Sequence, residues 1–200
     1  GLPLVPNFDE LRDFQSRALV RDYELKDIIE SILLQGRLES GKFILTRSSV
    51  NLKLLIDQCA NKCQTMRLRN QNTFTSSGEA ITVDSDSVAL THIINNLIGT
   101  ALKFTEHGEV HVHWWVDQNH FSIQVKDTGC GIAEANYENI FESFWQEDMR
   151  LERRFGGHGL GLAITKHLVG QLDGKITTTN CLVSPTCPIY IELRERFSIY

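Results

Sequence analysis

The 200 residues are 42% hydrophobic, which is enough to bury one sizeable core. The formal net charge of −5 argues against a nucleic-acid-binding protein, because such proteins present a basic face. No apolar run approaches the roughly 20 residues that a membrane span needs, and the N-terminus lacks a signal-peptide pattern. We therefore expect a soluble chain, or the soluble part of a membrane-anchored protein.

The chain begins with a predicted loop over its first ten residues, followed by a long helical pattern from about Leu11 to Gly41. Apolar residues recur there at three- and four-residue intervals, and Gly41 ends the pattern. A helix of about 30 residues is about 45 Å long, which is too long to bury its apolar stripe on a small domain. We expect it to dimerise through a helical bundle.

Three elements are predicted next. Phe43–Leu45 is expected to form a short strand, and a helix is expected from Asn51 to about Met66. Residues 72–83 are typical of a strand pair, broken by the turn-forming residues 76–78.

The middle of the chain has the clearest periodicity. Asp86 is a predicted N-cap for a helix that runs to Phe104. Residues 109–116 and 120–126 alternate as two strands joined by a short polar turn, which predicts a hairpin.

A polar stretch at 134–157 precedes a helix that is predicted over 160–172 and begins at a glycine-rich turn. Strands are predicted at 175–179 and 188–193. Helices mixed with hairpin strands indicate an α/β fold, a two-layer sandwich in which one mixed sheet is covered by helices on one face. The long amphipathic helix precedes this sandwich.

The spacing of the cysteines and histidines indicates neither a disulfide framework nor a metal site. The five cysteines show no paired C-x-x-C spacing, and Cys59 and Cys63 lie one helical turn apart, so reduced thiols in a cytosolic protein are favoured. His111 and His113 alternate on a predicted strand and share one face of the sheet. Without a third ligand in the sequence pattern, no metal site is expected there.

Two glycine motifs point to a nucleotide. Asp127-Thr128-Gly129-Cys130-Gly131 ends a predicted strand, and the run Gly156–Gly161 opens a predicted helix. An isolated glycine pair is most often a tight turn. Glycines that open a helix, however, expose N–H groups at the positive end of the helix dipole, which makes an anion site. No P-loop motif occurs, so a nucleotide site of another kind is indicated.

Four segments follow one another in the chain, at 96–105, 127–132, 141–146 and 153–164. In this order they resemble the four sequence boxes of the catalytic and ATP-binding domain of sensor histidine kinases, within the wider family that includes Hsp90, MutL and gyrase B. The F box resembles that of hybrid kinases, and residues 25–42 look like the second helix of the dimerisation and phosphotransfer hairpin with its linker. The resemblance implies a partial hairpin over 1–46 and a catalytic domain over 47–200. The four boxes are the N box Asn96–Thr105, the G1 box Asp127–Ile132, the F box Phe141–Gln146 and the G2 box Arg153–Ile164.

The resemblance implies ATP and Mg²⁺ as cofactors and gives each box a role. Asp127 would accept a hydrogen bond from the adenine amino group, and the other residues implied to line the base are Gly129, Gly131 and Ile132. The residues implied to face the phosphates are Lys103, Arg153, Arg154, Gly157, His158, Gly159, Leu160 and Gly161. Asn96 and Lys103 are the implied catalytic residues, and Asn96 and Thr100 the implied metal ligands.

Two departures from the family pattern matter. Thr100 stands where the N box normally supplies an asparagine for Mg²⁺, and His158 stands where threonine is commoner. A threonine hydroxyl is shorter than an asparagine amide, so we expect weakened Mg²⁺ binding. The chain also lacks a phosphoacceptor histidine, because none of its seven histidines begins an H box. Truncation before the second hairpin helix is the simpler explanation, and loss of the first helix is the other.

Three functions remain open from the sequence. The leading one is a histidine kinase catalytic region that phosphorylates a histidine outside this chain, with a response regulator or receiver domain as partner and a homodimer formed through the N-terminal helix. The alternative is a pseudokinase-like module that binds nucleotide without catalysis. A hydrolytic ATPase is disfavoured because Asn96 stands where such enzymes carry a glutamate base. We expect a cytoplasmic location, including the cytoplasmic part of an inner-membrane sensor, and no nucleic-acid or membrane contact by this fragment.

Overall fold

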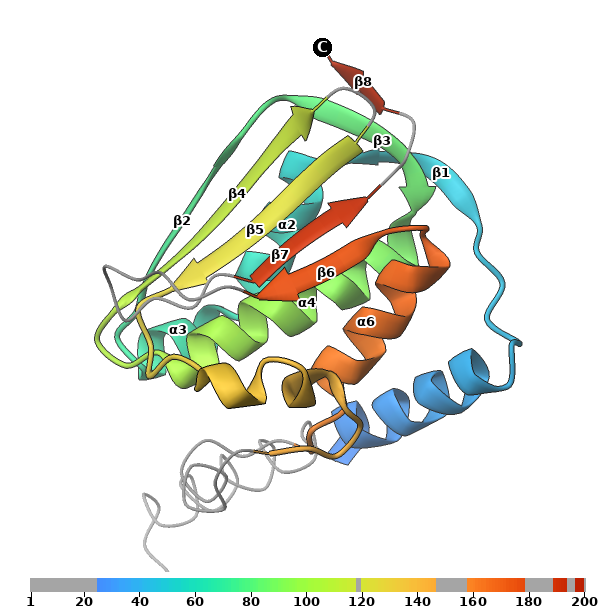
Figure 1. Cartoon of the computed structure of the whole chain (residues 1–200). Coiled ribbons are helices and arrows are strands. Elements are labelled where there is room, and N and C mark those ends of the chain that lie inside the picture. Colours follow the sequence, from blue (N-terminus) through green and yellow to red (C-terminus); the bar gives the residue numbers. More distant parts are fainter. Residues whose placement is uncertain (1–24, 118–119, 147–157, 179–188, 194–196, 200) are drawn as a thin grey trace, which may run out of the picture.

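The computed structural model describes residues 25–117, 120–146, 158–178, 189–193 and 197–199. A five-stranded sheet lies over two long helices, and a smaller sheet continues from one end of the larger one (Figure 1). The predicted α/β class with a mixed sheet covered by helices on one face is confirmed. The strands are divided between two sheets, which the single predicted sheet did not anticipate.

The N-terminal helix spans residues 25–39 within the described range. It ends as predicted at Gly41, whose φ of 64° is left-handed, and the N–H of Lys42 bonds back to the carbonyl of Arg37 at 2.9 Å. The part of the predicted helix before residue 25 lies outside the described residues. Leu34 and Leu38 are buried in the domain core, so one face of this helix packs against the sandwich.

The predicted strand at Phe43–Leu45 is wrong, because residues 42–46 are irregular and the first strand, β1, is Arg47–Asn51. Phe43 and Leu45 pack against the core while Ile44 is 83% exposed. The alternation in the sequence therefore reflects which side chains are buried, although this segment pairs with no strand of the described residues. The ladder begins only where Arg47 pairs with Asp86 of strand β3, Ile81–Asp86.

The helix predicted over residues 51–66 is two helices. Asn51 caps α2, Leu52–Lys62, by accepting a hydrogen bond from the N–H of Leu54 at 2.9 Å. The helix is interrupted at Cys63, and a second helix, α3, follows at Gln64–Arg69.

The strand pair predicted over residues 72–83 is also corrected. Strand β2, Thr73–Gly78, and strand β3 belong to different sheets and do not pair with each other. Strand β2 instead runs parallel to β4, Glu109–Asp117. Strand β2 ends at Gly78, where an added Cβ would overlap the indole of Trp114.

The large sheet has the order β2-β4-β5-β7-β6, and every pair except β2–β4 is antiparallel. Strand β5 is His120–Asp127, which confirms the predicted hairpin with β4. Strands β6, Lys175–Thr178, and β7, Ile189–Leu193, agree with the predicted ranges. Strand β8, Phe197–Ile199, was not predicted; it completes the small sheet β1-β3-β8.

Two helices cover the inner face of the large sheet. Helix α4 is Ser87–Phe104, and Asp86 caps it as predicted, its Oδ1 accepting from the N–H of Ala89 at 2.7 Å. Helix α6 is Gly161–Gln171, close to its predicted bounds. Two short 3₁₀ turns, η1 at Glu134–Asn136 and η2 at Asn139–Phe141, lie in the polar stretch between them. Alternate residues of β4 and β5 point inward to the helices; the fully buried ones are Val110, Val112, Trp114, Phe121 and Ile123.

Candidate functional site

The Asp127 turn is fixed by its contact with the end of helix α4. The Oδ1 of Asp127 accepts a hydrogen bond from the N–H of Gly129 at 2.9 Å. A Cβ at Gly129 would overlap the carbonyl oxygen of Phe104, so only glycine fits there. Gly131 has a φ of 73°, which also favours glycine. Both glycines are thus required by the path of the turn, and Ile132 is half-buried directly after it.

Burial raises the pKa of the Asp127 carboxyl above its ordinary value. The hydrogen bond from the N–H of Gly129 opposes this, because it favours the charged form. The result is a half-buried carboxyl at the end of β5, where it can accept a hydrogen bond from a donor of a ligand.

Helix α4 presents the N-box residues on one face. Asn96, Thr100 and Lys103 follow one another at four- and three-residue steps, so they share a face, and all three are half-buried. Asn96 is turned toward helix α6, since its Nδ2 donates to the carbonyl of Gly161 at 3.1 Å and lies 3.4 Å from the hydroxyl of Thr165. The Nζ of Lys103 lies 4.8 Å from the centre of the Phe104 ring.

The second glycine turn is held against the F-box segment. Gly159 has a φ of 68°, and its carbonyl accepts from the N–H of Phe144 at 3.0 Å. A Cβ at Gly159 would stand 2.8 Å from the carbonyl carbon of Phe144, so this position also requires glycine. Leu160 is 1% exposed and belongs to the core, which leaves only its backbone for a ligand. Arg153, Arg154 and Gly157 lie outside the described residues.

The first turn of α6 presents N–H groups of the kind that bind anions. Its N-cap is Leu160, which makes no side-chain capping bond. The N–H groups of a first helical turn lack intrahelical partners and lie at the positive end of the helix dipole. Together with Lys103, they make this end of the site suited to a polyanion.

Charge also links His158 to this end of the site. Its pKa is lowered, first by burial and then by the positive charge of Lys103, while Asp27 of the N-terminal helix opposes the shift. Charges of the N box and of the N-terminal helix therefore both act on the G2 turn at His158. A hydrogen bond of 3.3 Å from Gln35 Nε2 to the hydroxyl of Ser143 also ties that helix to the F-box segment.

Sequence reasoning missed two asparagines that position the end of α4. Asn72 is buried, and its Nδ2 donates to the carbonyls of Leu102 and Thr105 at 3.0 and 2.8 Å. Its Oδ1 accepts from the N–H of Gly108 at 3.2 Å. Asn70 adds a bond to the Leu102 carbonyl at 2.9 Å. Their only sequence signal is a pair of asparagines in a turn, which is typical of many turns.

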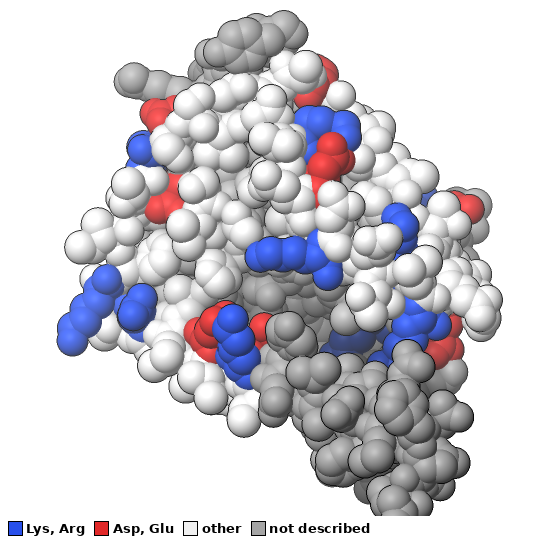
Figure 2. Space-filling view, turned by 180° about the vertical axis from the view of Figure 1, so that it is seen from behind, with Lys and Arg blue, Asp and Glu red and all other residues white. Residues whose placement is uncertain are grey.

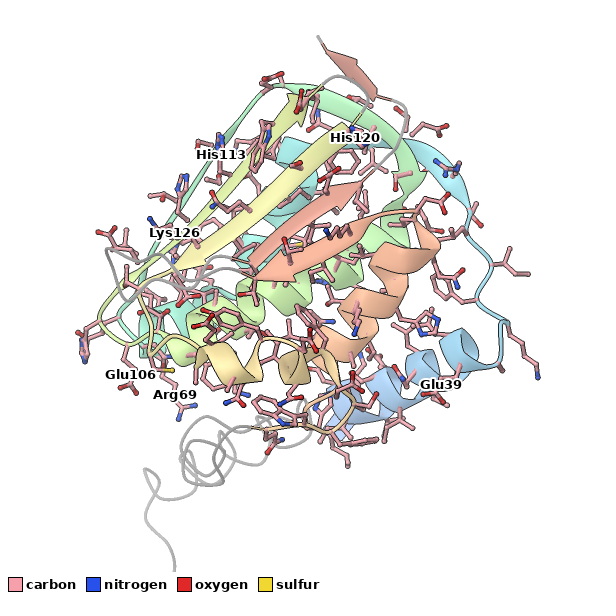
Figure 3. All side chains as sticks on the ribbon, viewed as in Figure 1. Glu39, Arg69, Glu106, His113, His120 and Lys126 are labelled. Carbon is pink, nitrogen blue, oxygen red and sulfur yellow. The ribbon has the colours of Figure 1, made fainter. Side chains whose placement is uncertain are left out.

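The open face of the large sheet is separate from this site. His111 and His113 share it as predicted, stacked with their ring centres 6.2 Å apart, and His113, His120 and Lys126 all project from it (Figure 3). The hydroxyl of Ser77 lies 3.1 Å from a ring nitrogen of each stacked histidine. Within the described ranges no group of three or more metal-ligating side chains gathers, here or elsewhere.

The opposite side carries a mixed surface. Seen from behind, Lys and Arg side chains are interspersed with Asp and Glu, and the visible described residues form no single basic face (Figure 2). Among the helices of the described ranges, none is both long and apolar enough to cross a bilayer.

Comparison with known proteins assigns the site to a family. Residues 85–196, more than half of the chain, match the family described as histidine kinase-, DNA gyrase B-, and HSP90-like ATPase. The chain belongs to this family. The residues matched to the ATPase family include helix α4 and both glycine turns, so they contain the whole candidate site.

Curated relatives of this ATPase-family chain are sensor kinases. The autoinducer 2 sensor kinase/phosphatase LuxQ of Vibrio vulnificus (strain YJ016) is 34% identical over 164 residues, which cover 75% of this chain and 19% of LuxQ. The signal transduction histidine-protein kinase BarA of Escherichia coli (strain K12) is 33% identical over 160 residues, 75% of this chain and 17% of BarA. The chain thus spans less than a fifth of these relatives.

Solved histidine kinases share the fold. Full-length ShkA in complex with AMPPNP superposes with a TM-score of 0.81 at 23% identity, over 98% of this chain and 41% of ShkA. Histidine kinase ThkA in complex with the response regulator TrrA gives 0.71 at 20% identity, over 97% of this chain and 54% of that chain. The likeness over nearly the whole chain includes the N-terminal helix as well as the sandwich of the ATPase family.

Proposed function

We propose that this chain is the ATP-binding catalytic region of a two-component sensor histidine kinase, and that it transfers the γ-phosphate of ATP to a histidine outside the chain. The observation that carries the proposal is that helix α4 touches both glycine turns. The Phe104 carbonyl lies against Gly129, and the Asn96 amide bonds to Gly161. These two contacts are about 12 Å apart by helical rise, which separates a site for the base from a site for the phosphates.

The residue roles follow from this division. Asp127 would accept from the adenine amino group, with Gly129, Gly131 and Ile132 beside the base. Asn96 and Lys103 would act on the transferred phosphate, where Lys103 contributes charge. The remaining residues proposed to bind the phosphates are Arg153, Arg154, Gly157, His158, Gly159, Leu160 and Gly161, with Leu160 contributing only its backbone.

The oxygen atoms of Asn96 and Thr100 on this half-buried face of α4 are suited to Mg²⁺. Because the Nδ2 of Asn96 is engaged with Gly161 and Thr165, its Oδ1 is the atom that it can offer to a cation. Thr100, one turn later, offers a hydroxyl oxygen, and Mg²⁺ takes oxygen ligands and keeps several waters. When bound, the ion would neutralise charge on the transferred phosphate.

The N-terminal helix supports a homodimer. Its inner face packs into the core through Leu34 and Leu38, yet four large apolar side chains remain about half exposed on its other side. Such a stripe is typical of a helix that pairs with another in a bundle. We propose that residues 1–46 belong to the dimerisation hairpin and 47–200 to the catalytic domain, in a cytoplasmic protein whose partner is a response regulator or receiver domain. The exposed side chains are Leu25, Ile29, Ile32 and Leu33.

Calorimetry and phosphotransfer test the proposed function. We expect the chain to bind ATP and ADP, and to bind GTP more weakly because GTP lacks the amino group that Asp127 would recognise. With labelled ATP and the histidine-bearing hairpin of its own full-length protein, label should pass to the hairpin. Equal binding of ATP and GTP would contradict the assignment of Asp127, and binding without transfer would favour the pseudokinase-like alternative.

The Thr100→Asn variant tests the proposed weakness in metal binding. Mg²⁺ is expected to strengthen ATP binding about tenfold more in Thr100→Asn than in the wild type, because the variant restores an amide oxygen. A tenfold difference corresponds to about 1.4 kcal/mol, as expected for one good ligand interaction. ATP affinity is measured by calorimetry with Mg²⁺ and with a chelator. Thr91→Asn on the first half of α4 is the matched control, because the Thr91 hydroxyl donates to the carbonyl of Ser87 within the same helix. An unchanged Mg²⁺ gain in Thr100→Asn would refute the hypothesis.

A further inference from the structure

His158 is held in place by the residues that follow it. Leu160 is anchored in the core, Gly159 is bonded to Phe144, and Gly161 is bonded to Asn96. The ring is half-buried at the mouth of α6, and its Nε2 atom is fully buried. Within the described part of the chain, this nitrogen has no hydrogen-bond partner. A buried polar atom without a partner is costly, and a ligand that supplies the missing hydrogen bond would remove that cost.

Burial and the charges around the His158 ring determine its protonation state in the nucleotide-free protein. Lys103 of α4 and Asp27 of the N-terminal helix act on it with opposite signs, and burial together with Lys103 holds the pKa of His158 below the ordinary 6.5. The imidazole is therefore neutral at neutral pH in the nucleotide-free protein. Its buried nitrogen lies at the end of the site that the first turn of α6 and Lys103 make suited to a polyanion.

We propose that the His158 side chain is itself a ligand of the nucleotide's phosphate chain, and that its imidazole takes up a proton from solvent when the nucleotide binds. The inference rests on the proposed function and extends it, because it gives the phosphate site a proton-linked ligand. The threonine that is commoner at this position of the G2 box carries a hydroxyl, which does not titrate in this range.

Electrostatics gives the direction of the effect. Phosphates bound beside Lys103 offset its positive charge and add negative charge near the ring, so the pKa of His158 is higher in the complex than in the free protein. By linkage, His158 adds no pH dependence above the bound-state pKa. Nucleotide affinity then rises as pH falls between the two pKa values, and levels off below the free-state pKa. The rise is up to about tenfold for each unit between them.

Proton uptake is measured by calorimetry with ADP and Mg²⁺ between pH 6 and 8, in two buffers of different ionisation enthalpy. We compare the wild-type chain with His158→Thr, so that the titration of the nucleotide itself cancels. His120→Gln removes a histidine on the open face of the sheet and serves as the control (Figure 3). The wild type and His120→Gln should take up more protons than His158→Thr, and their affinity should gain about three- to tenfold more on going from pH 8 to pH 6.

A second readout is the NMR titration of the His158 ring, whose midpoint should move to higher pH with ADP and move little with AMP, which lacks the outer phosphates. Equal proton uptake by the wild type and His158→Thr, with both binding ADP, would overturn this inference and leave the proposed function standing. An absence of nucleotide binding by the wild type would overturn both.

Discussion

The Asp127→Asn variant is expected to bind ATP about 10- to 100-fold more weakly than the wild type, because a hydrogen bond to a charged group contributes about 1.5–3 kcal/mol. The substitution is nearly isosteric. An asparagine Oδ1 can still accept from the N–H of Gly129, which the carboxylate does at 2.9 Å, so the turn should keep its path. Its amide nitrogen, however, is a donor and would face the adenine amino group, also a donor.

The measurement is ATP affinity by calorimetry, together with a thermal melt to establish that the fold is intact. Asp117→Asn is the matched control, since Asp117 is exposed at the far end of β4, where it pairs with His120. ATP affinity in Asp127→Asn that equals that of Asp117→Asn would show that the base is not read by this carboxyl.

The Asn72→Ala variant is expected to lower the free energy of unfolding by about 2–4 kcal/mol, because each buried polar group left without a partner costs about 1–3 kcal/mol. Alanine would remove the donor to the Thr105 carbonyl and the acceptor for the Gly108 N–H. The Leu102 carbonyl would keep its bond from Asn70, which moderates the loss.

Urea denaturation measures this change, and Asn70→Ala is the control. The Asn70 side chain donates to a carbonyl that Asn72 also contacts, so its loss should cost about 1 kcal/mol or less. Equal destabilisation by the two variants would contradict the role given to Asn72. ATP affinity should fall as well in Asn72→Ala, because Asn72 holds the end of α4 that contacts Gly129.

Local chemistry explains which elements could be predicted. Helix α4 has a capping aspartate and a regular apolar period, and both signals lie within the segment that they specify. The β4–β5 hairpin likewise depends on a short turn and on alternation within its own residues. The two glycine turns could be predicted because close contacts at Gly129 and Gly159 admit only glycine, and a glycine is visible directly in the sequence.

Non-local pairing explains what could not be predicted. Strand β2 is parallel to β4, with Thr73 opposite Glu109, and no residue near Thr73 encodes that partner. The Phe43–Leu45 segment was predicted to be a strand but pairs with no described strand. Its apolar alternation arises from contacts of Phe43 and Leu45 with the core. The role of Asn72 depends on carbonyls 30 and 33 residues away in sequence, which a turn signal does not reveal.

The place of β7 within the large sheet has a consequence for synthesis on the ribosome. Residues Ile189–Leu193 lie between β5 and β6, so the last strand of the large sheet to be made fills an interior position. Until it has emerged, β5 and β6 have no common partner, and the edge of β5 with which β7 will pair stays open. The nascent chain must therefore carry the finished residues of both glycine turns in an incomplete sheet, and the large sheet that supports the candidate site is complete only once Leu193 has emerged.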